Sequence, residues 1–177
     1  FTIEQFSCDL YEFMMEHGIR KAILLGFSDG ANIAMKFAMK HPEMIRALIL
    51  NGGNLDARGV KPLTQIPIEI GYRIAERFAE KSPGARRNAE LLGLMVNDPN
   101  IRTEDLVKIH APTLVICGRR DMIKESHTRE IAAGIPGAKL VIIKGDHFIA
   151  AKRPLEFNRA VGAFLDPVMV MRGESDL

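Results

Sequence analysis

The chain has 177 residues, of which 47% are apolar, and its 24 lysines and arginines nearly balance 22 aspartates and glutamates. This length supports one domain with its own core, and the apolar content is that of an ordinary globular protein. The charge balance excludes the strong field of a nucleic-acid or membrane-surface protein, so a small-molecule partner is expected.

Helices and strands alternate in the first part of the chain. Thr2 with Gln5 forms a capping box that predicts a helix start, and Gly18 is typical of a helix end. Two short, uninterrupted apolar runs follow, as in strands buried on both faces of a parallel sheet. In chain order, the expected elements are a helix to residue 18, a strand over 22–25, a helix over 29–40 and a strand over 47–50.

The alternation stops near residue 54 and resumes near residue 105. The segment between these points is rich in proline and charge and contains two predicted helices, over 68–81 and 85–95. This composition predicts an inserted helical cap. The expected domain organisation is a core in two parts, 1–54 and 106–166, a cap or lid over 55–105, and a loosely held tail over 167–177.

The last part of the chain returns to the alternating pattern. It predicts a strand over 113–117, a helix over 126–133, a strand over 140–143 and a helix over 154–165. Repeated crossovers of this kind imply the α/β class, with a mostly parallel sheet and helices on both of its faces. Functional groups are expected at the carboxyl ends of the strands.

The run Gly26-Phe27-Ser28-Asp29-Gly30 joins a predicted strand to a predicted helix, which is the context of a nucleophile elbow. Glycine at both flanks is expected to let strand and helix approach each other around a strained serine. The backbone amide of Asp29, at the helix start, can then donate to an oxyanion. The alternative is a glycine-rich turn with an incidental serine.

Two further polar residues follow buried strands. Asp121 comes after the strand over 113–117, and His147 comes after the strand over 140–143. The chain order serine, aspartate, histidine is the one expected for a triad on this kind of sheet. Each residue alone has another interpretation, because Asp121 could cap a turn and His147 could pack in a loop.

With the elbow, Gly118-Arg119-Arg120-Asp121 and Gly145-Asp146-His147 resemble the signature stretches of the α/β-hydrolase family, and the resemblance covers nearly the whole chain. It implies a serine esterase with Ser28 as nucleophile, His147 as base and Asp121 as the orienting acid, with no metal or cofactor. The Ser-Asp pair of the elbow is similar to that of valacyclovir hydrolase-like esterases. Asp146 replaces the family's usual glycine and is expected to be solvated.

The resemblance also implies that something is missing. The chain begins near the helix that precedes the elbow strand, so the family's first strands and the loop with its second oxyanion amide have no counterpart here. The strand over 22–25 then becomes an exposed edge, which predicts self-association or an upstream polypeptide in the natural protein.

Substrate contacts are predicted at Phe27 and in the cap, at Ile70 and Ile74. The apolar spacing of Ile66, Ile70, Ile74 and Phe78 has two interpretations, a substrate pocket or packing of the cap on the core, and packing is favoured. The expected substrate is a small ester or a related acyl compound. Carbon–carbon bond hydrolysis, acyl transfer, perhydrolysis and a non-catalytic relative of the fold are the alternatives.

The two cysteines and one further histidine have less specific interpretations. Cys8 and Cys117 are far apart in apolar stretches, and as reduced thiols they favour a cytoplasmic protein. His127 stands at a predicted helix start, where a surface histidine is favoured over one that approaches the substrate pocket.

Overall fold

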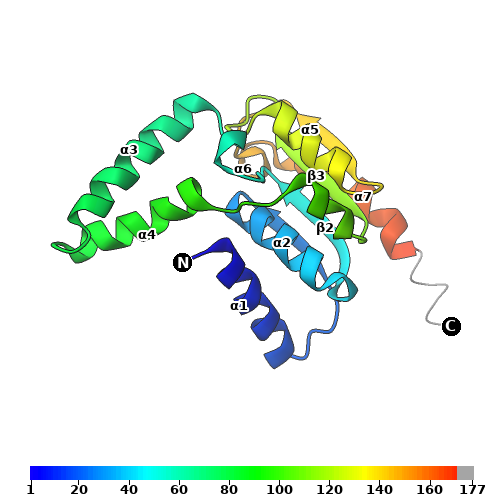
Figure 1. Ribbon diagram of the computed structural model, residues 1–177. Helices are drawn as coiled ribbons and strands as arrows, with labels where there is room; N and C mark the ends of the chain where they lie inside the picture. Colours follow the sequence, from blue (N-terminus) through cyan, green and yellow to red (C-terminus); the bar gives the residue numbers. More distant parts are fainter. Residues whose placement is uncertain (171–177) are drawn as a thin grey trace.

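A four-stranded sheet forms the centre of the molecule (Figure 1). The computed structural model describes residues 1–170. The strands lie in chain order, and every neighbouring pair is parallel. They are β1 (Ala22–Phe27), β2 (Ile45–Asn51), β3 (Thr113–Gly118) and β4 (Lys139–Ile143). The predicted α/β class with a mostly parallel sheet is confirmed.

Helices cover both faces of this sheet. Residues of α1 (Ile3–Glu16), α2 (Asp29–Lys40) and α5 (Glu125–Gly134) share one core cluster with the strands. Residues of α6 (Ile149–Lys152) and α7 (Pro154–Val170) share a second cluster with them. The sheet is therefore the middle of three layers.

Alternation along β2 separates the two clusters. Leu48 and Leu50 lie in the first cluster, whereas Ala47 and Ile49 lie in the second, and all four side chains are buried. Successive side chains of a strand point to opposite faces, so a strand covered on both sides needs an apolar residue at every position. This explains the uninterrupted apolar runs of the sequence.

Between β2 and β3 the chain forms a helical hairpin, α3 (Pro62–Phe78) and α4 (Pro83–Asn97), whose helices pack mainly on each other (Figure 1). Both helices begin earlier than the apolar spacing predicted, which was residue 68 for the first and residue 85 for the second. Each starts with a proline, whose fixed φ suits the first helical position.

The C-terminal helix is longer than predicted. It was expected to end at residue 165, with a tail from 167, but α7 continues to Val170. The expectation for the tail is therefore wrong for residues 167–170, and residues 171–177 lie outside the described part of the chain. The four-residue helix α6 was not predicted because one turn is too short to give a period.

β1 is an edge of the described sheet. It pairs with β2 on one side, and Leu25 and Phe27 remain 51% and 39% exposed. An edge strand offers unpaired backbone donors and acceptors to any strand that approaches it. Two large apolar side chains therefore lie exposed on a strand that has an unpaired edge.

Candidate active site

Ser28 lies in a strained turn between β1 and α2. Its φ of 54° is in the left-handed region, which is uncommon for a residue with a side chain. Its amide donates to the carbonyl of Asn51, at the end of β2, with an N···O distance of 2.9 Å. The serine is thus held at the carboxyl end of the sheet, at the N-cap of α2.

The two glycines that flank the elbow differ in the space around them. A Cβ on Gly26 would lie 2.2 Å from the carbonyl oxygen of Gly30, so the absence of a side chain lets strand and helix approach. A Cβ on Gly30 itself would meet no atom within 4 Å. The expected need for glycine is confirmed at the first position and wrong at the second.

Asp121 and His147 are joined by a buried hydrogen bond. Nδ1 of His147 lies 2.7 Å from Oδ1 of Asp121, and the two residues are only 6% and 2% exposed. The same carboxylate oxygen accepts from the amide of Ile123 at 3.0 Å. The loops after β3 and β4 therefore converge, as expected for the carboxyl ends of neighbouring parallel strands.

Gly52 makes room for this pair. A Cβ there would lie 2.8 Å from Cε1 of His147 and 3.4 Å from Oδ2 of Asp121, and its φ of 66° also favours glycine. This role of Gly52 was not predicted, although the Gly52-Gly53 dipeptide directly after a strand was a signal for a close approach.

In the part of the chain that the structure describes, no hydrogen bond joins Ser28 to His147. The ring of Phe27, the residue before the serine, nevertheless lies over the histidine ring, with a centroid separation of 4.8 Å. Catalytic hydrogen bonds are often long in the absence of substrate. The three predicted catalytic residues thus reach the same end of the sheet, and the acid and base are already paired.

The carboxyl group of Asp29, beside the nucleophile, is half-buried. Burial raises the pKa of this group, while the nearby His147 opposes the rise. Its Oδ1 is 3.5 Å from the side-chain amide of Asn32. As the first residue of α2, Asp29 also has a backbone amide without an acceptor inside the helix, as the oxyanion prediction requires.

The candidate substrate residues occupy separate elements. Phe27 contacts the ring of His147, whereas Ile70 and Ile74 lie on α3 with 54% and 56% of their surfaces exposed. Ile66 and Phe78 are also about half exposed, at 54% and 48%. The favoured interpretation, that these four residues pack the helix onto the core, is therefore wrong.

Two histidine-related expectations have opposite outcomes. Asp146 is solvated as predicted, and Lys152 lowers the pKa of its carboxyl group through a hydrogen bond. His127 is not a surface histidine, because only 12% of its side chain is exposed.

Nucleophilic chemistry at the buried Cys117 is disfavoured, since burial raises the pKa of its thiol to about 11.

No cluster of three or more histidine, cysteine or carboxylate side chains suited to a metal ion occurs in the described residues. Within the same part of the chain, no helix combines the length and the apolar character needed to cross a membrane.

The chain is similar in sequence and in structure to known hydrolases. A family model described as alpha/beta hydrolase fold matches residues 1–66. The human serine hydrolase BPHL is 26% identical over 92% of this chain. The 2-hydroxy-6-oxononadienedioate/2-hydroxy-6-oxononatrienedioate hydrolase 2 of Pseudomonas putida is 24% identical over 84% of this chain. The enol-lactonase of Burkholderia xenovorans LB400 has a similar structure, with a TM-score of 0.71 at 22% identity, covering 93% of this chain and 73% of that one.

The chain spans only part of its curated relatives. It covers 60% of the length of the human protein and 64% of the Pseudomonas protein. The likeness nevertheless extends over most of the present chain, at 92% of it for the human protein and 93% for the enol-lactonase structure.

Proposed function

Because the chain belongs to the α/β-hydrolase fold family, we propose that the protein is a serine hydrolase acting on a small carboxylic ester or a related acyl substrate. Ser28 is the nucleophile, His147 the general base and Asp121 the acid that orients it. The observation that carries this proposal is the buried 2.7 Å pair of Asp121 and His147 at the sheet end where Ser28 sits in a strained turn.

The reaction proceeds in two acyl-transfer steps. His147 takes the hydroxyl proton as Ser28 attacks the carbonyl carbon, and Asp121 stabilises the resulting imidazolium. The amide of Asp29 donates to the oxyanion, and the imidazolium gives its proton to the departing alcohol. Water, activated by the same histidine, then cleaves the acyl-enzyme to release the acid and restore the serine.

The α3–α4 hairpin is the lid in this proposal, within a cap that covers residues 55–105. Phe27 beside the base, and Ile70 and Ile74 on α3, form the apolar contacts to substrate, which fits their exposure. The names of the relatives include an oxo-acid hydrolase and an enol-lactonase, so other carbonyl chemistry on the same triad is the alternative. Product analysis by mass spectrometry separates these reactions.

The partner in this proposal is a small molecule, and the compartment is the cytoplasm. Cys8 and Cys117 are both free, which is compatible with a reducing environment.

Labelling with a fluorophosphonate, followed by intact-mass analysis, tests the nucleophile. One adduct per chain is expected on the wild type, because only an activated serine attacks phosphorus rapidly. Ser28→Ala is expected to remove the adduct, whereas Ser126→Ala, at an exposed serine, is expected to keep it. Labelling at a residue other than Ser28, or none at all, would contradict the proposal for this chain.

The edge of β1 is the proposed surface for self-association. In sedimentation or light scattering, the wild-type chain is expected to form dimers or larger species through this edge. Leu25→Lys is expected to shift it to monomers, because an edge lysine opposes strand pairing. Leu63→Lys is the control, since Leu63 is 93% exposed on α3. A monomeric wild type, or an equal response to both substitutions, would exclude association through β1.

A further inference from the structure

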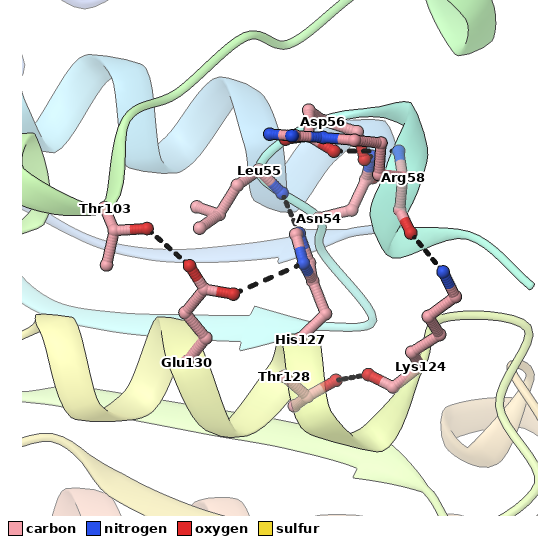
Figure 2. Close-up of polar contacts among 9 residues, drawn as sticks. All are labelled: Asn54, Leu55, Asp56, Arg58, Thr103, Lys124, His127, Thr128 and Glu130. Atoms are coloured by element: carbon pink, nitrogen blue, oxygen red, sulfur yellow. Dashed lines mark hydrogen bonds and ion pairs between the residues drawn. The ribbon is translucent and has the colours of Figure 1, made fainter.

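His127 is a largely buried histidine that the proposed reaction does not use. It lies in the first turn of α5, and its Nε2 accepts a hydrogen bond from the backbone amide of Leu55 at 2.8 Å. Figure 2 shows the ring directed at the segment that enters the α3–α4 hairpin. A ring nitrogen accepts only when it carries no proton, so the imidazole is neutral with its hydrogen on Nδ1.

The other side of the ring faces the segment that leaves the hairpin. Nδ1 lies 3.6 Å from Oε2 of Glu130, whose Oε1 accepts from the hydroxyl of Thr103 at 2.5 Å (Figure 2). The two segments also meet directly, because the amide of Ile101 donates to the carbonyl of Leu55 at 2.8 Å. His127 therefore lies where both connections of the hairpin join the core.

Asn54, the residue before Leu55, connects this segment with the helix that follows the elbow. The amide of Asn54 donates to Oδ1 of Asn32 at 2.9 Å, and the Asn32 side chain donates back to Oδ1 of Asn54 at 3.0 Å. Asn32 lies in the first turn of α2, whose N-cap is Ser28. Two consecutive residues thus connect the elbow helix on one side with α5 on the other.

We propose that neutral His127 is a positioning residue that holds residues 54–55 between α5 and the elbow helix, and that acid releases this contact. This inference rests on the proposed function, because Ser28 is the group that is positioned. Protonation places a hydrogen on Nε2, where it faces the Leu55 amide, so two donors oppose each other. Leu55 is only 2% exposed, so the amide that loses its acceptor belongs to a buried residue.

Burial and the charged groups around the ring set the pH at which this happens. Burial lowers the pKa of His127, Lys124 and Arg58 act in the same direction, and Asp56 and Glu130 oppose them. A histidine whose pKa is lowered on folding contributes its stability in the neutral form. This contribution is complete above the ordinary pKa of 6.5 and is lost as the pH falls through the folded value.

Hydrogen exchange of the Leu55 amide tests the contact, with the Gly52 amide, which donates to Ile116, as reference. Between about pH 7.5 and pH 5, the protection factor of Leu55 is expected to fall about tenfold in the wild type. His127→Leu is expected to have the low value throughout. His127→Gln keeps an uncharged acceptor and is expected to retain protection without a pH response. His110→Gln, at an exposed position, is the control.

Gly59→Ala displaces the ring without changing its chemistry. The added Cβ would lie 2.4 Å from Cδ2 and 2.5 Å from Nε2 of His127. We expect it to lower Leu55 protection about tenfold at neutral pH, as His127→Leu does. Gly162→Ala is the matched control, because a Cβ there meets no atom within 4 Å.

The outcomes separate the positioning role from the proposed function. Leu55 protection that ignores pH in the wild type, or a glutamine variant that behaves like leucine, would overturn the role of His127. So would fluorophosphonate labelling of Ser28 at an unchanged rate in His127→Leu. If wild-type Ser28 is not labelled while Leu55 responds as expected, the proposed function fails and the acid-sensitive contact stands.

Discussion

Replacing Asp121 by alanine is expected to lower the rate of acyl transfer about 10⁴-fold. The buried carboxylate is 2.7 Å from Nδ1 of His147. In the proposed reaction it fixes the tautomer that leaves Nε2 free to accept the serine proton, and it stabilises the imidazolium that forms in the transition state. The measurements are the rate of fluorophosphonate labelling at Ser28 and the turnover of a simple nitrophenyl ester.

Asp121→Asn separates the contribution of the negative charge from that of the histidine tautomer. The amide of Ile123 donates to Oδ1 of Asp121 at 3.0 Å, which favours an amide oxygen over an amide nitrogen at that position. The asparagine can then keep the histidine tautomer while losing the negative charge, so we expect a rate between those of alanine and wild type. Asp146→Ala, at the solvated carboxylate beside His147, is the control. If the rate of Asp121→Ala is within tenfold of the wild-type rate, Asp121 is not a member of the triad.

The positions of these residues were predictable because the sheet is parallel and buried. Each uninterrupted apolar run had to be a strand covered on both faces, and the residues after it had to lie at one edge. Ser28, Asp121 and His147 follow three such runs, and the strands that carry them are now β1, β3 and β4. The order of residues along the chain was therefore enough to bring acid and base together.

What the sequence did not reveal depends on contacts between distant segments. His127 looked like a surface residue because its neighbours in the chain are polar, yet the segment of Leu55 and Gly59 covers it. The stripe of Ile70 and Ile74 looked like a packing face because its spacing is helical. Spacing identifies a common face but not its partner, and α3 packs mainly on α4.

The elbow provides a second test, because its two flanking glycines, Gly26 and Gly30, differ in what an added Cβ would meet. Gly26→Ala is expected to destabilise the fold by about 3 kcal/mol, since overpacking against backbone has no flexible neighbour to absorb it. The new Cβ would meet the carbonyl oxygen of Gly30 at 2.2 Å and the amide nitrogen of Ala31 at 2.5 Å. Strand β1 and helix α2 would have to separate, and Ser28 lies between them.

Thermal unfolding of Gly26→Ala and Gly30→Ala should therefore give opposite results. The first variant is expected to unfold about 6 to 12 °C below wild type, as about 3 kcal/mol implies for a chain of this size. The second is expected to match or exceed wild type, because its Cβ meets no atom and alanine favours a helix by about 1 kcal/mol over glycine. Equal losses in both variants would mean that the elbow needs glycine for a reason other than the approach of strand and helix.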